Sequence, residues 1–203
     1  AKQLGIWLNV GSLALMSSSG KLVNRSLLFA PDGAIKARYD KIHLFDVDLP
    51  NGEMLRESHA YDRGKDVCLA ELPWARLGMT ICYDVRFPAL YRELGQRGAE
   101  IITVPSAFTV PTGEAHWHVL LRARAIETGG FILAAAQGGR HESGRETYGH
   151  SLAVSPWGEV LAEAESEPRL LLVDIDPAQV ADARRRVPAL GNKRTFTLRG
   201  SPA

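Results

Sequence analysis

The sequence has few of the features that mark membrane, disulfide-rich or nucleic-acid-binding proteins. Its apolar runs, such as FILAAAQ, are far too short to cross a bilayer. Two cysteines, Cys68 and Cys82, cannot build a disulfide framework or, alone, a four-ligand zinc site. Lys and Arg number 24 against 23 Asp and Glu, so no broad field favours nucleic acid or an anionic membrane. With 45% apolar residues in 203, the composition predicts a soluble cytoplasmic domain, either an enzyme or a binding module.

The start of the sequence carries neither an initiator methionine nor the pattern of a targeting peptide. Residues Ala1–Gly5 read as the end of a helix with a glycine stop, and Ile6–Val10 read as a strand. Because a domain rarely begins in the last turn of a helix, we expect further residues upstream of Ala1.

The order of the predicted elements indicates a single α/β domain with a mixed sheet. Short apolar runs bounded by turn residues predict strands over 26–29, 34–39, 67–72, 77–82, 101–104, 131–136, 151–155, 160–164 and 170–175. Periodicity and caps predict helices over 88–97, 113–128 and 177–186. Strands that are apolar at consecutive positions (IITV, FILAAA, LLLV) are usually covered on both faces, as in a layered sandwich. Trp117, Leu121 and Ile126 lie near helical spacing, so we expect them on one packed face.

Cys82 stands at a position typical of reactive groups in α/β proteins, between the end of a strand and the start of a helix. A helix N-terminus favours the thiolate, and the backbone N–H after the cysteine could face a developing oxyanion. Free cysteine is also among the most buried residue types, so a structural role is the alternative. Cys68 alternates with apolar neighbours inside a strand and is expected in the core.

A nucleophilic thiol needs partners, and the sequence offers several. There are six histidines, and spacing places none of them beside Cys82. Lys41 leaves a strand and enters the apolar stretch IHLF, where a lysine can become a positioned cation. Taken separately, Lys41 and Glu57 are better explained as a solvated lysine near a strand end and a solvated or capping carboxylate.

Several blocks taken together resemble the nitrilase superfamily of carbon–nitrogen hydrolases. In chain order they are RYDKIHLF (38–45), GMTICYDVRFP (78–88), TGEAHW (112–117), LRARAIE (121–127), YGHS (148–151) and PWG (156–158). The resemblance covers nearly the whole chain, and within the superfamily it is strongest to the amidases of the Nit branch. The stretches PSAF and AAAQGGRH resemble the deaminated glutathione amidases, with the omega-amidases that act on α-ketoglutaramate as near neighbours.

This resemblance implies an αββα sandwich over residues 1–203 that forms a homodimer or a higher homo-oligomer, without a metal or an organic cofactor. It places the family's nucleophile on Cys82, its lysine on Lys41 and a further active-site glutamate on Glu57. In the implied reaction the Cys82 thiolate attacks a small amide, ammonia leaves, and water hydrolyses the thioester. Lys41 and the N–H of Tyr83 would stabilise the oxyanion. No nucleic-acid or membrane partner is implied.

The general base of the family is a glutamate upstream of the lysine, in a Pro-Glu motif. No glutamate precedes Glu53 in this sequence, so we expect an N-terminally incomplete family pattern. Glu57 could stand in as the base. A non-catalytic binding or assembly partner is therefore a second hypothesis.

Two further expectations concern the substrate and a competing mechanism. A small carboxylated ω-amide would need a cationic clamp, and Arg86 and Arg145 are the candidates. Their alternative role is in ordinary surface or structural ion pairs. A hydrolase that pairs the cysteine with His150 or His116 is the third hypothesis, and it ranks last because these histidines fit no part of the pattern.

Overall fold

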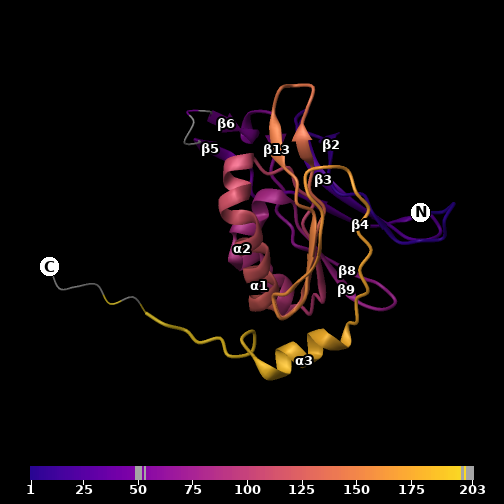
Figure 1. Ribbon diagram of the computed structural model, residues 1–203, viewed down its shortest axis with the longest axis vertical. Coiled ribbons are helices and arrows are strands. Elements are labelled where there is room, and N and C mark those ends of the chain that lie inside the picture. Colours follow the sequence, from indigo (N-terminus) through magenta and orange to yellow (C-terminus); the bar gives the residue numbers. More distant parts are fainter. Residues whose placement is uncertain (49–51, 53, 198, 200–203) are drawn as a thin grey trace.

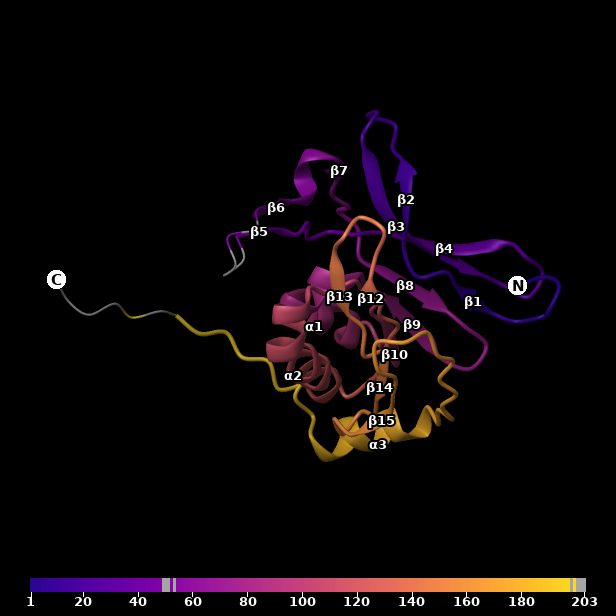
Figure 2. The same cartoon turned by 45° about the horizontal axis from the view of Figure 1, so that its top comes forward.

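In the computed structural model, which describes residues 1–48, 52, 54–197 and 199, two β-sheets pack face to face (Figure 1 and Figure 2). One sheet contains β1 (Leu8–Asn9), β2 (Leu13–Met16), β3 (Leu22–Phe29), β4 (Ile35–Asp40) and β7 (Tyr61–Asp62). The other runs in the spatial order β15 (Val160–Glu163), β14 (Leu152–Val154), β11 (Phe131–Ala134), β10 (Ile101–Thr103), β9 (Arg76–Met79) and β8 (Cys68–Glu71). Smaller hairpins are formed by β5 (Asp46–Asp48) with β6 (Met54–Arg56), and by β12 (Gly138–Arg140) with β13 (Glu146–Tyr148).

The six-stranded sheet is mixed, as the sequence predicts. Strands β9, β10 and β11 are parallel, with Ile101 of β10 opposite Leu77 of β9 and Phe131 of β11. Strands β8, β14 and β15 join its two sides in antiparallel register. Helices in the crossover connections lead from β9 to β10 and from β10 to β11, as parallel pairing requires.

Both faces of this sheet are buried, because successive side chains of a strand point to opposite sides. Ile101 and Phe131 pack toward the five-stranded sheet, where they meet Leu28 and Tyr39. The next residues along the same strands, such as Ile102, pack toward the helices. This explains why these strands are apolar at consecutive positions and confirms the predicted α/β sandwich class.

Helices α1 (Pro88–Gln96) and α2 (Val110–Thr128) cover the outer face of the six-stranded sheet. Helix α2 begins three residues before the predicted position, because Pro111 fits its first turn, where no backbone donor is needed. It ends at Gly129, which has a left-handed φ of 57°. Helix α3 (Ala178–Arg186) follows, and the N–H of Ala178 donates to Asp176 at 2.9 Å.

Three local predictions are wrong. Residues 170–175 form no strand, because no described segment pairs with them, and Leu170 and Leu172 are exposed. Residues Ala1–Gly5 form turns rather than a helix end. On α2, Trp117 and Leu121 are fully buried, whereas Ile126 is 55% exposed, because Ala125 occupies the next buried position of the 3.6-residue period.

No helix among the described residues combines the length and the hydrophobicity that a membrane span needs. Both cysteines are free thiols.

Candidate active site

Cys82 is the first residue of a short 3₁₀ helix, η2 (Cys82–Arg86), at the sharp turn that follows β9. Its φ of 50° is in the left-handed region, which costs a residue with a side chain about 1–2 kcal/mol. The turn is held because the N–H of Cys82 donates to the carbonyl of Pro105 at 3.0 Å, and that of Asp84 donates to Ile81 at 3.1 Å. Strain that the surrounding structure enforces is typical of functional positions.

Cys82 lines a cavity of about 770 Å³, within the size range of sites for small molecules. Lys41, Glu57, Tyr83 and Arg145 line the same cavity, so the fold brings together five of the six residues that the sequence singled out. They come from the end of β4, the 3₁₀ turn η1 (Glu57–His59), η2 and the loop between β12 and β13. The cavity therefore lies where segments from both sheets meet.

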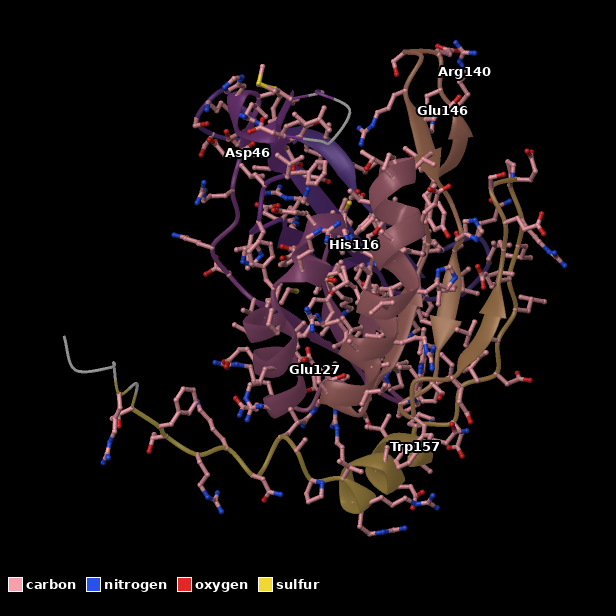
Figure 3. The ribbon with its side chains drawn as sticks, turned by 60° about the vertical axis from the view of Figure 1, so that its left-hand side comes forward. Asp46, His116, Glu127, Arg140, Glu146 and Trp157 are labelled. Atoms are coloured by element: carbon pink, nitrogen blue, oxygen red, sulfur yellow. The ribbon has the colours of Figure 1, made fainter. Side chains whose placement is uncertain are left out.

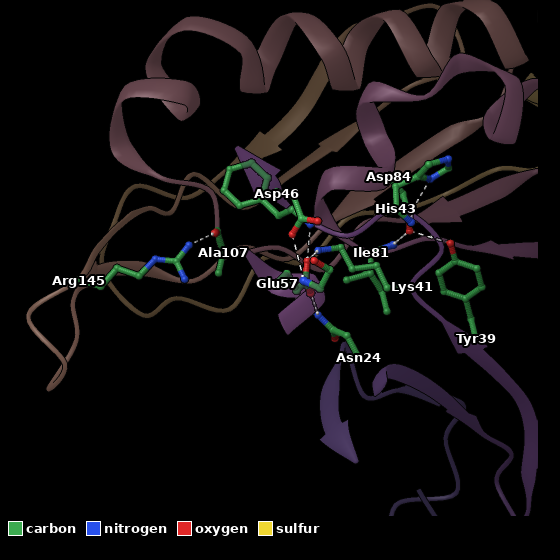
Figure 4. A network of polar contacts seen from close by, with 12 residues as sticks. Asn24, Tyr39, Lys41, His43, Asp46, Glu57, Ile81, Asp84, Ala107 and Arg145 are labelled. Carbon is green, nitrogen blue, oxygen red and sulfur yellow. Dashed lines mark hydrogen bonds and ion pairs between the residues drawn. The ribbon is translucent and has the colours of Figure 1, made fainter. Parts of the chain in front are cut away.

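Lys41 and Glu57 form a buried ion pair at one side of this cavity (Figure 4). Lys41 Nζ lies 2.6 Å from Glu57 Oε2, and the lysine is only 3% exposed. The same carboxylate accepts the N–H of Phe45 at 2.6 Å and the side-chain amide of Asn24 at 3.3 Å. Because three donors surround it, Glu57 is fixed in place and in turn fixes the ammonium group of Lys41.

Asp84 is a second buried carboxylate, and it joins the lysine segment to the cysteine turn. One of its oxygens accepts the Tyr39 hydroxyl at 2.7 Å and the N–H of Ile81 at 2.9 Å. The other accepts the N–H of His43 at 3.1 Å and lies 2.7 Å from its ring Nδ1. Burial and the neighbouring Asp84 charge raise the pKa of Tyr39 above its ordinary value, so its phenol stays a donor.

The two arginines proposed as a clamp occupy different places. Arg145, in the loop between β12 and β13, lines the cavity and donates to the carbonyl of Ala107 at 3.3 Å. Figure 3 shows that this hairpin, which carries the labelled Arg140 and Glu146, projects beyond the start of α2. Arg86 is not among the described residues that line the cavity.

Arg86 lies beside the cavity, and its guanidinium packs against two aromatic rings that line it. Its central carbon lies 5.9 Å from the ring centre of Tyr83 and 5.3 Å from that of Phe108. Burial lowers the pKa of Arg86 from its ordinary value. The geometry thus favours Arg145 over Arg86 as the group that meets a substrate anion.

The described lining of the cavity gives no support for a histidine partner of Cys82. Among the described residues that line the cavity there is no histidine. His116 lies on α2 (Figure 3), with its Nδ1 3.3 Å from Arg86, and His150 pairs with Glu163. His43 lies beneath the cysteine turn, where it stacks on Phe87 with 3.6 Å between ring centres.

Cys68 lies in β8 with its sulfur 3.6 Å from that of Met79. Burial raises the pKa of the Cys68 thiol, which keeps it protonated and unreactive.

Sequence reasoning missed two residues of the site, Asp84 and Asn24. The sequence did contain a signal for Asp84, because an acidic residue three positions after Ile81 can accept the backbone N–H at the start of a helix. Asn24 had none, since its contact with Glu57 spans 33 residues.

Comparison with known proteins agrees with this architecture. The carbon–nitrogen hydrolase family matches residues 1–185, and the chain belongs to this family. It is thus placed among the hydrolases that act on carbon–nitrogen bonds other than peptide bonds.

Among its relatives are amidases of two kinds. The chain is 47% identical over 197 residues to the deaminated glutathione amidase of Yersinia enterocolitica, covering 96% of this chain and 69% of the relative. It is 38% identical over 195 residues to omega-amidase NIT2 of Homo sapiens, covering 96% and 70%.

Solved structures of the family share the fold. The Caenorhabditis elegans NitFhit protein matches with a TM-score of 0.86 at 40% identity, covering 95% of this chain and 48% of that one. A mutant of the amidase from Nesterenkonia sp. AN1, with the acetamide moiety of fluoroacetamide added covalently at its active-site cysteine, matches with a TM-score of 0.74 at 30% identity. That match covers 91% of this chain and 67% of the amidase.

Proposed function

We propose that residues 1–203 form a single cysteine-dependent amidase domain that hydrolyses the C–N bond of a small carboxylated ω-amide and releases ammonia. The observation that carries this proposal is the shared cavity, which is lined both by a cysteine at a strained turn and by a buried lysine. The covalent adduct at the active-site cysteine of the Nesterenkonia amidase supports the choice of nucleophile.

The proposed reaction has two stages. The Cys82 thiolate adds to the amide carbon, and the ammonium of Lys41 with the N–H of Tyr83 stabilises the negative oxygen. The C–N bond then breaks, the nitrogen takes a proton and leaves as ammonia, and the acyl group stays on sulfur as a thioester. Water adds to the thioester, its proton returns the sulfur to a thiol, and the carboxylic acid departs.

Both stages need a proton acceptor. Among the described residues that line the cavity, Glu57 is the one with a carboxylate side chain. Its oxygens already accept three hydrogen bonds. We therefore assign Glu57 to holding Lys41 in place. Ammonia release by this chain alone then tests whether its cavity contains a group that can accept the proton in both stages.

The charges around the cavity and the relatives support this substrate class. Arg145 at the rim suits a substrate carboxylate, to which an arginine can donate two hydrogen bonds. Deaminated glutathione is the first substrate to test, because the relative of that name is 47% identical, against 38% for the omega-amidase. The amide α-ketoglutaramate is the second.

The test is ammonia release from these two amides, with Cys82→Ala compared to Cys68→Ala. Release that is lost only with Cys82→Ala supports the amidase. If the unmodified chain releases no ammonia and Cys82 reacts with iodoacetamide no faster than free cysteine at pH 7, the non-catalytic hypothesis is favoured instead.

We further propose that the protein acts in the cytoplasm as a homodimer. Val119 and Ile126 of α2 are 69% and 55% exposed, and a spacing of seven residues puts them on one helical face. Light scattering measures the mass. A monomer at micromolar concentration contradicts this proposal.

A further inference from the structure

Three potential metal ligands converge outside the amidase cavity. They are His118 on α2, His150 in the connection between β13 and β14, and Glu163 at the end of β15. Oε1 of Glu163 lies 2.8 Å from Nε2 of His118 and 2.8 Å from Nδ1 of His150. The three ligand atoms all lie within 4.8 Å of one another, and none of these residues belongs to the described lining of the cavity.

The backbone holds His150 in place for this cluster. Its φ of 55° is in the left-handed region, as for Cys82. Its N–H donates to the carbonyl of Glu165 at 3.2 Å, and its own carbonyl accepts the indole N–H of Trp117 at 2.8 Å. The imidazole also stacks on Tyr148, with 4.1 Å between the ring centres. The ring is therefore positioned by packing.

His118 and Glu163 are also carried by regular elements. Helix α2 packs on the six-stranded sheet, and β15 is paired with β14, where Leu152 lies opposite Glu163. All three side chains are only partly exposed, between 28% and 35%, which leaves one open side for solvent. A site with three protein ligands and one open position is the arrangement found in catalytic zinc sites.

The donor set is one that a divalent transition metal prefers. Two imidazole nitrogens with one carboxylate oxygen suit Zn²⁺, which binds nitrogen at about 2.0–2.1 Å and oxygen at about 2.0–2.2 Å. Tetrahedral ligands at such lengths stand about 3.4 Å apart. The two observed separations from Glu163 Oε1, each 2.8 Å, are shorter than this value by about 0.6 Å, so small side-chain shifts would be enough to admit the ion. Each imidazole would then carry its proton on the other ring nitrogen.

We propose that His118, His150 and Glu163 bind one Zn²⁺ ion, with water as the fourth ligand. The ion would link α2 to the two segments that flank β14, which follow His118 by 32 and 45 residues. Its role is to tie the helix layer to the edge of the sheet. No step of the proposed amide hydrolysis passes through it.

The experiment is a titration of the whole chain, first stripped of metal with a chelator, using Zn²⁺ against a chromophoric competitor and Co²⁺ for its absorption spectrum. The expected result is one ion per chain and the visible spectrum of tetrahedral Co²⁺. At a free Zn²⁺ concentration 100 times Kd, the midpoint of thermal unfolding should rise by about 5–10 °C.

Four variants separate this site from others. His118→Ala and Glu163→Gln should each weaken Zn²⁺ binding by more than the roughly 10–100-fold that loss of an outer-shell partner costs. His116→Ala, two residues away on the same helix, is the matched control and should leave the affinity unchanged. Cys82→Ala should also leave it unchanged, since the thiol is in the other site. Circular dichroism checks that each variant folds.

Two outcomes overturn the proposal. One is a Kd above about 1 mM for the unmodified chain, which is about 4 kcal/mol of binding and leaves only a hydrogen-bonded cluster. The other is binding that survives both His118→Ala and Glu163→Gln or that disappears with Cys82→Ala. Either result is independent of ammonia release, so this proposal and the amidase proposal fail separately.

Discussion

Replacing Asp84 by Asn should be among the most damaging conservative changes in this protein. The carboxylate is fully buried and accepts hydrogen bonds from two backbone N–H groups, those of Ile81 and His43, one at each oxygen. An amide keeps one acceptor oxygen and replaces the other with an NH₂ donor. Whichever way the amide turns, a backbone N–H faces another donor.

The magnitude follows from that unpaired group. A buried donor without a partner costs about 1–3 kcal/mol, and the remaining hydrogen bonds lose their charged acceptor, which is worth about 1 kcal/mol more. Asp84→Asn should therefore destabilise the fold by about 2–4 kcal/mol. For a chain of this length that lowers the midpoint of thermal unfolding by roughly 5–15 °C.

Urea unfolding followed by tryptophan fluorescence measures this free energy of unfolding, and two controls with smaller expected costs are compared with it. Tyr39→Phe removes one donor but keeps the carboxylate, so it should cost about 1 kcal/mol. Asp40→Asn breaks a partly exposed pair with Arg25, which should cost at most about 1 kcal/mol. The reasoning is refuted if Asp84→Asn costs no more than Asp40→Asn.

The same variant tests whether Asp84 positions the thiol. Asp84 Oδ2 accepts the N–H of Ile81, the residue before Cys82, so a looser turn should slow the alkylation of Cys82 by iodoacetamide. Asp40→Asn should leave that rate unchanged. A destabilised Asp84→Asn protein with an unaltered alkylation rate would limit this carboxylate to a structural role.

Two further predictions concern the core and the second thiol. Leu121→Ala should cost about 2–5 kcal/mol in urea unfolding, because Leu121 is fully buried, whereas Glu114→Ala at an exposed position of the same helix should stay within about 0.5 kcal/mol. Equal effects would contradict the assignment of the two helical faces. Since burial raises the pKa of Cys68, little thiolate forms there at pH 7, and mass spectrometry should find iodoacetamide on Cys82 well before Cys68. Labelling of Cys68 first would be inconsistent with this environment.

Elements that depend on neighbouring residues could be predicted from the sequence. The hairpin between β3 and β4 is an example, because Asp32 accepts the N–H of Ala34 at 2.8 Å and Gly33 takes a φ of 86°. Both features belong to the turn itself. Residues 170–175 show the opposite case, since a strand needs a partner that no local pattern provides.

In the candidate site, too, some features could be predicted from the sequence and others could not. The resemblance to a family singled out Cys82, Lys41 and Glu57 as candidates, but it did not predict how Lys41 is held. Its contact with Glu57 spans 16 residues, and the contact of Asp84 with His43 spans 41. Such contacts depend on how the two sheets pack, which residue type alone does not determine.

The packing of the two sheets therefore matters for the proposed reaction. Lys41 follows β4 of one sheet, and Cys82 follows β9 of the other, so their spacing is set by the packing between the sheets. Asp84 bridges the two by accepting bonds from Tyr39 of β4 and from Ile81 beside the thiol. The core between the sheets is therefore part of the machinery that positions the site. The helix layer also contacts the cysteine turn directly, because Arg124 of α2 donates to the carbonyl of Val85 in η2 at 2.7 Å.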